Sequence, residues 1–165
     1  MKTLAFLTRM ASTGLIWVAG LGLIAMTAIV SWQVFGRYVL NSSPSWSEQA
    51  ALTLMIWFVT LAAAGGVREG FHIRITALED MVGPGARKAM RITADLVVGA
   101  IGVAMALWGG ELVIRTWGHV IPSLGLSRGL AYLGLPLAGG LIALFSLERI
   151  LEELSGQAPA DKDVA

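Results

Sequence analysis

The sequence predicts an all-α integral membrane protein of four transmembrane helices, with both termini on the cytoplasmic side. Three observations predict this. Of the 165 residues, 56% are hydrophobic and only 14% are charged, whereas soluble domains carry about 25% charged residues. Four long apolar stretches are separated by short polar ones. The lysines and arginines gather in alternate polar segments, the pattern of a topology in which positive charge stays in the cytoplasm.

Net charge and cysteine content narrow the classes of function. The formal net charge is +1 and the basic residues are scattered along the chain, so no nucleic-acid-binding surface is indicated. The chain has no cysteine, which excludes disulfides, thiolate metal sites and cysteine nucleophiles.

The first two predicted helices are the clearest. Residues 11–36 form the first, because no charged residue occurs between Arg9 and Arg37 and about 20 apolar residues suffice to cross the hydrocarbon core. This stretch is longer than the apolar part of a signal peptide, so we expect no cleavage. Residues 46–67 form the second helix, which is uncharged between Glu48 and Arg68.

The third predicted helix covers residues 89–114 and the fourth covers residues 129–147. Pro136 lies inside the fourth helix, where we expect it to introduce a kink. Residues 1–154 therefore form one transmembrane domain. Residues 155–165 are small, polar and charged, and we expect a disordered cytoplasmic tail because they cannot bury enough apolar surface to order themselves.

The distribution of positive charge sets the predicted orientation. Nine of the lysines and arginines lie in the N-terminus, the segment 68–91 and the C-terminus: Lys2, Arg9, Arg68, Arg74, Arg87, Lys88, Arg91, Arg149 and Lys162. The other two connections hold only Arg37, Arg115 and Arg128. This difference places both termini in the cytoplasm. Aromatic residues gather near the opposite, outer interface, as amphipathic rings do: Trp32, Tyr38, Trp46, Trp117 and Tyr132.

Two connections carry local patterns. Ser45 and Glu48 have the spacing of a capping box, which would begin the second helix at the outer surface. In the inner connection, Ile75, Leu78 and Val82 recur at helical spacing, which predicts a short amphipathic helix in the inner interface between helices two and three. Gly83-Pro84-Gly85 would end it, and Arg87, Lys88 and Arg91 would anchor helix three to anionic headgroups.

Two stripes of mostly small residues predict close helix packing, since helices in lipid associate where small side chains let backbones approach. The stripe on helix two contains Trp46, Ala50, Thr53, Trp57, Thr60 and Ala64, and the stripe on helix three contains Asp95, Gly99, Gly102, Ala106 and Gly109. The packing partner of each stripe, in this chain or in another, is left open. Trp57 lies at mid-depth, and we expect it to pack against protein, because tryptophan otherwise prefers the interfaces.

Charged residues within the spans lie near helix ends. Asp95 follows Arg91 by four residues and Glu111 precedes Arg115 by four, so each is expected to form a local ion pair. No acidic residue lies at the centre of a predicted helix, which argues against a small ion-coupled carrier that acts alone.

An enzymatic or haem-binding role is not indicated. His72 and His119 are the only histidines, and the predicted topology puts them on opposite sides of the membrane, so they cannot ligate one haem. The sequence has no hydrolase, zinc-protease or phosphate-binding signature. We expect no cofactor and no catalysis.

With these features in place, the chain resembles the small membrane subunit of tripartite ATP-independent periplasmic (TRAP) transporters, the DctQ-like small permease family. The resemblance runs from about Thr13 to Glu152. Its motifs, in order, are Gln33-Val34-Phe35-Gly36-Arg37-Tyr38, Trp46-Ser47-Glu48-Gln49-Ala50, Trp57, Ala62-Ala63-Ala64-Gly65-Gly66-Val67-Arg68, His72-Ile73, Ser123-Leu124-Gly125-Leu126, Tyr132 and Leu135-Pro136-Leu137-Ala138-Gly139. At Gln49 the family commonly has an acidic residue, so a role of that second acid in partner contact is in doubt here.

The resemblance implies a non-enzymatic helper subunit in the bacterial inner membrane. Such a subunit scaffolds a large polytopic permease and helps to dock a periplasmic substrate-binding protein, which delivers an organic acid for uptake driven by an ion gradient. The residues expected to contact the large subunit are Thr53, Trp57, Thr60, Ala64, Gly99, Gly102 and Ala106. Those expected at the outer docking face are Arg37, Trp46 and Glu48. Those expected to anchor the inner loop, in contact with membrane lipids, are Arg68, His72, Arg87, Lys88 and Arg91.

Two other interpretations fit the residues without the resemblance. One is a membrane anchor subunit of a redox complex that binds quinone or haem. The other is an independent small four-helix carrier. The substrate, the coupling ion and the oligomeric state are not determined by the sequence.

Overall fold

The computed structural model describes residues 2–69 and 83–155. Within them the elements are α1 (Lys2–Tyr38), α2 (Ser47–Glu69), α4 (Pro84–Thr116), β1 (Val120–Ile121), β2 (Leu126–Ser127), α5 (Arg128–Tyr132) and α6 (Gly134–Leu154). Four segments of this described part are long and apolar enough to cross a membrane: Met10–Tyr38, Ser47–Arg68, Gly85–Thr116 and Arg128–Leu154. The predicted class of all-α protein with four membrane-spanning helices is thus confirmed.

Three predictions fall on residues outside the described part of the chain. They are the amphipathic inner helix around residues 75–82, the placement of His72, and the tail beyond residue 155. The orientation of the termini also stays a prediction, since the structure contains no membrane.

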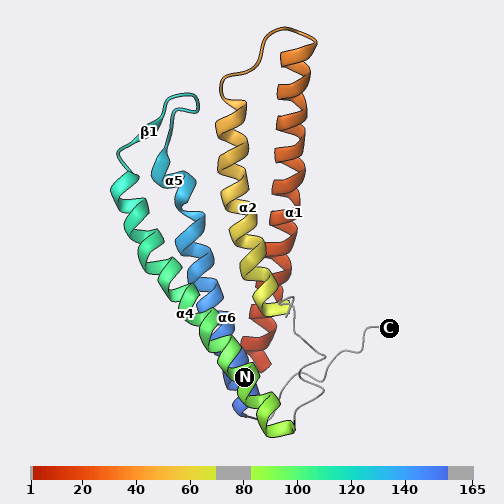
Figure 1. Cartoon of the computed structure of the whole chain (residues 1–165), viewed down its shortest axis with the longest axis vertical. Helices are drawn as coiled ribbons and strands as arrows, with labels where there is room; N and C mark the ends of the chain where they lie inside the picture. Colours follow the sequence, from red (N-terminus) through yellow and green to blue (C-terminus); the bar gives the residue numbers. More distant parts are fainter. Residues whose placement is uncertain (1, 70–82, 156–165) are drawn as a thin grey trace.

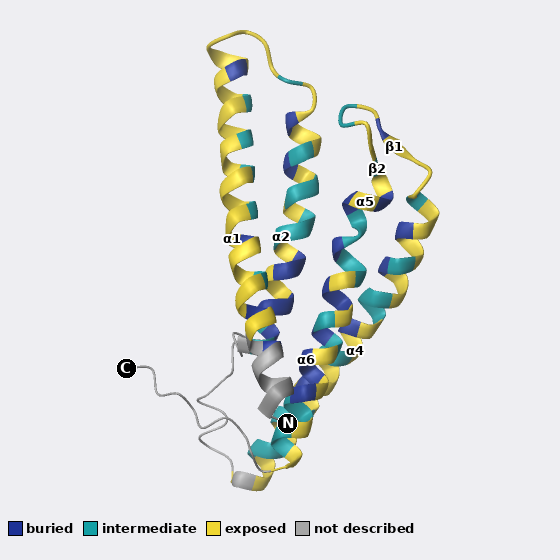
Figure 2. Cartoon of the chain, turned by 180° about the vertical axis from the view of Figure 1, so that it is seen from behind, coloured by how far each residue is buried: buried dark blue, intermediate teal, exposed yellow. Residues whose placement is uncertain are grey.

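The four spans form two antiparallel hairpins, α1 with α2 and α4 with α6. In Figures 1 and 2 the hairpins converge at one end and separate at the other. The hairpins meet mainly through α2 and α6, around a core of Ala64, Val67, Ala138, Ile142 and Phe145. We call the convergent end the charged end, because it carries buried ion pairs, and the opposite end the loop end.

The depth of the bundle matches a bilayer. From Ser47 to Arg68 on α2, and from Asp95 to Thr116 on α4, each helix rises by about 31 Å at 1.5 Å per residue, close to the hydrocarbon thickness of about 30 Å. The first turns of α4, with Arg87, Lys88 and Arg91, extend beyond the charged end. Most large apolar side chains on the outer faces are exposed, as expected for a chain whose solvent is lipid.

The fourth predicted helix is in fact two helices. α5 ends at Tyr132 and α6 begins at Gly134, so the helix is interrupted at Leu133, whose backbone dihedral angles stay in the right-handed helical region. Pro136 is the third residue of α6, in the first helical turn, where its missing N–H costs no intrahelical bond. The expected kink therefore takes the form of a helix break three residues earlier, and α6 runs to Leu154 rather than ending near residue 147.

The connection between α1 and α2 differs from the predicted capping box. α2 begins at Ser47, whose buried hydroxyl donates to the carbonyl of Pro44 at 2.7 Å, and this described loop shows no hydrogen bond between Ser45 and Glu48. Gly36 permits the turn, because a Cβ there would lie 2.7 Å from the carbonyl oxygen of Ser42. Ser47, rather than the predicted Ser45, therefore makes the hydrogen bond at the start of α2, because the chain folds back over the end of α1.

The connection between α4 and α5 contains a short antiparallel pair, which the sequence pattern did not predict. Val120 pairs with Ser127 and Ile121 pairs with Leu126. Gly125 adopts φ +68° at the turn, a conformation that glycine reaches without strain. The Ser127 hydroxyl accepts from the backbone N–H of Gly129 and donates to the carbonyl of Trp117 at 2.6 Å, so this hairpin fixes the start of α5.

Candidate functional site: charged end, packed seams and groove

The charged end joins all four spans through buried polar groups. Arg68 of α2 lies 3.3 Å from Glu148 of α6. The Thr8 hydroxyl of α1 donates to Glu148 Oε1 at 2.8 Å and accepts from Arg68 Nε at 3.3 Å. Thr8 and Glu148 are buried, at 4% and 6% exposure. Three helices are therefore linked by one ion pair and its shared hydroxyl.

A second pair brings in α4. Arg149 Nε of α6 lies 3.0 Å from Asp95 Oδ1, and Arg149 Nη1 donates to the carbonyl of Val67 at 2.9 Å, near the C-terminal end of α2. Asp95 thus has a tertiary partner in Arg149, which the prediction of a local pair with Arg91 did not include. The reason is that α6 brings a guanidinium to a buried carboxylate, which must be paired where water is excluded.

The other predicted local pair is confirmed. Arg115 Nη2 lies 2.6 Å from Glu111 Oε1, and both side chains are more than half exposed. This pair lies at the loop end and joins two residues of one helix, so it contributes little to the packing of the bundle.

The small-residue stripe on α4 is used within the chain. A Cβ on Gly102 would lie 2.8 Å from the backbone nitrogen of Ala143, and a Cβ on Gly139 would lie 2.6 Å from the backbone nitrogen of Ala106. A Cβ on Gly99 would lie 3.2 Å from Ser146 Cβ. α4 therefore lies against the backbone of α6 at Gly102 and Ala106 and against the Ser146 side chain at Gly99, so the chain itself uses these positions of the predicted large-subunit surface.

The stripe on α2 is also largely used within the chain. Trp57 Nε1 donates to the carbonyl of Leu130 at 3.3 Å, which accounts for a tryptophan at mid-depth. Thr60 is buried and donates to the carbonyl of Ile56 at 2.7 Å, while a Cβ on Gly134 would lie 3.1 Å from Thr60 Oγ1. Ala64 is fully buried in the core. Trp57, Thr60 and Ala64 thus position α5 and α6 against α2.

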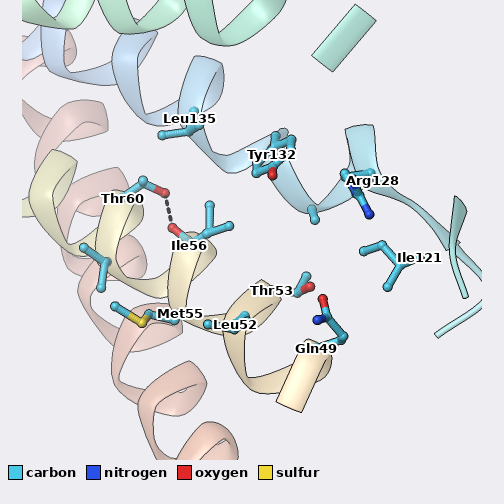
Figure 3. A pocket seen from close by; sticks show the side chains of 12 residues that line it. Gln49, Leu52, Thr53, Met55, Ile56, Thr60, Ile121, Arg128, Tyr132 and Leu135 are labelled. Carbon is cyan, nitrogen blue, oxygen red and sulfur yellow. Dashed lines mark hydrogen bonds between the residues drawn. The ribbon is translucent and has the colours of Figure 1, made fainter. Parts of the chain in front are cut away.

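Thr53, another residue of that stripe, lines a groove between the hairpins. The groove encloses about 580 Å³ and lies at the loop end, between α2 on one wall and β1, α5 and α6 on the other. Figure 3 shows Gln49 and Thr53 on the α2 wall and Arg128, Tyr132 and Leu135 on the opposite wall. No sequence pattern indicates this groove, because it arises from the divergence of two hairpins.

The predicted docking residues lie at one end of the bundle. Arg37 is exposed near the end of α1 and Glu48 is exposed near the start of α2, and Trp46 is 42% exposed just before α2. All three belong to the loop end. Among the predicted inner anchors, Arg68 is instead part of the buried charged end, while Arg87, Lys88 and Arg91 lie in the first turns of α4.

The outer faces of the two hairpins expose large apolar side chains. On α1 these include Trp17 at 71%, Leu21 at 63% and Ile24 at 66%, and on α4 they include Leu107 at 67% and Trp108 at 72%. Trp17 is seven residues from Met10 and Trp108 is eight residues from Thr116, so each lies about 10 to 12 Å inside the nearer end of its span at 1.5 Å per residue. At such a depth a tryptophan lies away from the membrane interfaces that it prefers.

Within residues 2–69 and 83–155, no group of three histidine, aspartate or glutamate side chains is placed to hold a metal ion. The side chains of Arg68, Asp95, Glu148 and Arg149 at the charged end instead join helices to one another. Fold and site together define a multi-pass helical membrane protein whose buried charges serve its own assembly.

Comparison with known proteins defines the family. The model of the family described as tripartite ATP-independent periplasmic transporters, DctQ component, matches residues 26–156. The chain therefore belongs to the DctQ family of TRAP transporter components, and it is a multi-pass inner-membrane protein.

Individual relatives are named as TRAP permease proteins. The sialic acid TRAP transporter small permease protein SiaQ of Vibrio cholerae is 25% identical over 126 residues, which cover 76% of this chain and 73% of that protein. The ectoine TRAP transporter small permease protein TeaB of Halomonas elongata is 27% identical, over 73% of this chain and 63% of that protein. The isethionate TRAP transporter permease protein DctMQ of Oleidesulfovibrio alaskensis is 27% identical over 82% of this chain, which corresponds to 22% of that protein.

Proposed function

We propose that the chain is the small membrane subunit of a TRAP transporter and acts as a scaffold for a large permease subunit. Family membership supports the transporter role. The observation that carries the scaffold role is the division of surfaces: small and polar residues are used inside the bundle, whereas large apolar side chains are exposed at hydrocarbon depth. A rigid bundle with a free apolar face is what a membrane scaffold requires.

The large subunit contacts the exposed face of α1 in this proposal. In the most apolar stretch of α1, only 6% is buried inside the structure, which is the smallest share among the four described spans. At Gly14 and Gly20 on this helix, an added Cβ would meet no described atom within 4 Å, so a partner helix can approach closely. Trp17 and Leu21, both exposed, supply large side chains to fill such a contact.

The fused relative supports the identity of the partner. The relative named DctMQ is a single permease protein, and this chain matches 22% of its length. The remaining, much larger part of that protein corresponds in this proposal to the large permease subunit. The residues on the α2 stripe, Thr53, Trp57, Thr60 and Ala64, support this partner indirectly by setting the shape of the bundle.

The periplasmic substrate-binding protein docks at the loop end in this proposal. Arg37, Trp46 and Glu48 are exposed there, on the side that the charge distribution predicts to be outside. Arg87, Lys88 and Arg91 extend past the opposite end, which supports cytoplasmic termini. The substrate class in this proposal is a small organic acid, in line with the relatives named for sialic acid and isethionate, and the family resemblance implies that an ion gradient drives the uptake.

The experiment is co-purification in mild detergent after co-expression with the large and binding-protein subunits of the same transporter. We expect a one-to-one complex with the large subunit. Trp17→Ala should weaken it by about 30-fold, the effect of losing a buried tryptophan contact of about 2 kcal/mol.

Trp108→Ala is the matched control, because the same side chain is equally exposed on the other hairpin. It should leave the complex unchanged. Loss of the complex in Trp108→Ala alone would move the contact to α4. Recovery of the wild-type chain without any large subunit, in several detergents, would contradict the scaffold role.

A further inference from the structure

The groove between the hairpins has the length of one lipid leaflet. It runs along α2 from Gln49 to Thr60, a rise of about 16 Å at 1.5 Å per residue, against about 15 Å for half of a hydrocarbon core. It ends at mid-depth, because Gly134 closes onto Trp57 and Thr60, and the buried core lies below that level.

A transmembrane helix does not fit this groove. A spanning helix needs a path of about 30 Å, whereas the hairpins close at mid-depth. An acyl chain is much narrower than a helix and ends at the bilayer midplane, which matches a groove that is closed at mid-depth.

The lining changes character along the groove. Toward mid-depth it is apolar, with Ile56, Val59 and Leu135. Toward the loop end it carries Arg128 together with Gln49. The side chain of Arg128 is exposed and makes no ion pair within the described part of the chain. A cation and an amide above an apolar slot complement a phosphate above an acyl chain.

We propose that this groove binds one phospholipid of the leaflet at the loop end. The phosphate lies against Arg128, the Gln49 amide donates to a phosphate or ester oxygen, and one acyl chain lies between α2 and α6. This lipid fills the space that the diverging hairpins leave open, and it holds their spacing at the loop end. The inference goes beyond the scaffold role and requires only that the large subunit leaves this groove unoccupied.

The test is native mass spectrometry of the full chain in mild detergent, titrated with phosphatidylglycerol after delipidation. We expect one tightly retained lipid per chain. Arg128→Gln should weaken its binding about tenfold, the effect of one charge-assisted hydrogen bond, and Arg128→Lys should restore most of it. Ile56→Trp, which fills the apolar slot, should abolish retention.

Arg115→Gln is the matched control. It removes an arginine at the same end of the molecule, but Arg115 pairs with Glu111 outside the groove, so binding should not change. Circular dichroism and monodisperse elution must be equal in every variant compared, and Ile56→Trp supplies the test if Arg128→Gln does not fold. Equal retention in wild type, Arg128→Gln and Ile56→Trp would overturn the proposal, as would an equal loss in Arg115→Gln.

A second measurement separates a lipid from a protein occupant. A photo-crosslinking amino acid at Thr53, which lines the groove, is activated in the assembled complex with the large subunit. An adduct of lipid mass supports the proposal. An adduct with the large subunit would overturn it while leaving the scaffold role intact.

Discussion

The two ends of the bundle are built on different principles. At the charged end, buried ion pairs and hydrogen bonds from Arg68, Glu148, Arg149 and Asp95 join α1, α2, α4 and α6. At the loop end, the hairpins diverge around a groove of about 580 Å³. The side-chain hydrogen bond from Trp57 to the carbonyl of Leu130 joins the two hairpins at mid-depth, between the core and the loop end.

This difference shows what fixes helices in lipid. Apolar surface gives no preference for one helix neighbour over the surrounding acyl chains, so polar groups and close backbone contact must supply it. The charged end has both, since the ion pairs lie beside the core of Ala64, Ala138 and Phe145. At the loop end, no hydrogen bond or ion pair joins the described side chains that line the two walls of the groove, and the hairpins separate there. Three substitutions test this comparison.

The largest effect is expected from Glu148→Gln at the charged end. The change removes the carboxylate charge beside Arg68, whose side chain is only 17% exposed. Breaking a buried ion pair from one side costs about 3 kcal/mol of unfolding free energy. The measurement is denaturant unfolding in bicelles followed by circular dichroism.

Glu111→Gln is the control at the loop end. It removes an acidic partner of arginine from an exposed pair, and the unfolding free energy should stay within about 0.5 kcal/mol of wild type. Similar losses in the two variants would show that the ends do not differ as described.

An intermediate effect is expected from Gly139→Ala in the second hairpin. The added Cβ would lie 2.6 Å from the backbone nitrogen of Ala106 and 2.7 Å from the carbonyl oxygen of Gly102. α4 and α6 must then separate, at a cost of about 2 kcal/mol, as in overpacked cores. Unfolding in bicelles measures it.

The neighbouring Gly140 supplies the control, because no described atom lies within 4 Å of a Cβ placed there. Gly140→Ala should leave stability unchanged or raise it by up to about 1 kcal/mol through helix propensity. A loss in Gly140→Ala equal to that in Gly139→Ala would mean that the backbone contact is not the cause.

The smallest effect is expected from Trp57→Phe. The ring remains, but the hydrogen bond to the carbonyl of Leu130 at 3.3 Å is lost. Side-chain hydrogen bonds inside membranes contribute about 0.6 kcal/mol on average, so we expect a loss of that size in the same unfolding assay. Trp32→Phe, at a side chain that is 52% exposed on α1, should cause no loss. A larger loss for Trp32 than for Trp57 would contradict the assigned contact.

Part of the candidate site was readable from the sequence and part was not. Residues related by helical spacing were found: the Glu111–Arg115 pair, and the stripes containing Gly102 and Trp57. The tertiary partners of Asp95 and Arg68 were missed, because Arg149 and Glu148 come from α6, more than 50 residues away along the chain. The available signal was the pair of adjacent charges Glu148 and Arg149, directly after the fourth predicted span, of which only Arg149 was used, as part of the charge count that sets the orientation.

The sequence by itself determined the class of protein, the four spans and the positions of the small-residue stripes. These follow from composition and from periods of three and four residues, which are local properties of a chain in lipid. Only the tertiary structure decided which stripes face which helix, how Asp95 and Glu148 are neutralised, and where the hairpins part. Those outcomes depend on contacts between segments that are distant in the sequence. An apolar side chain is as stable against lipid as against another helix, so the hydrophobic pattern alone does not decide which of the two it contacts.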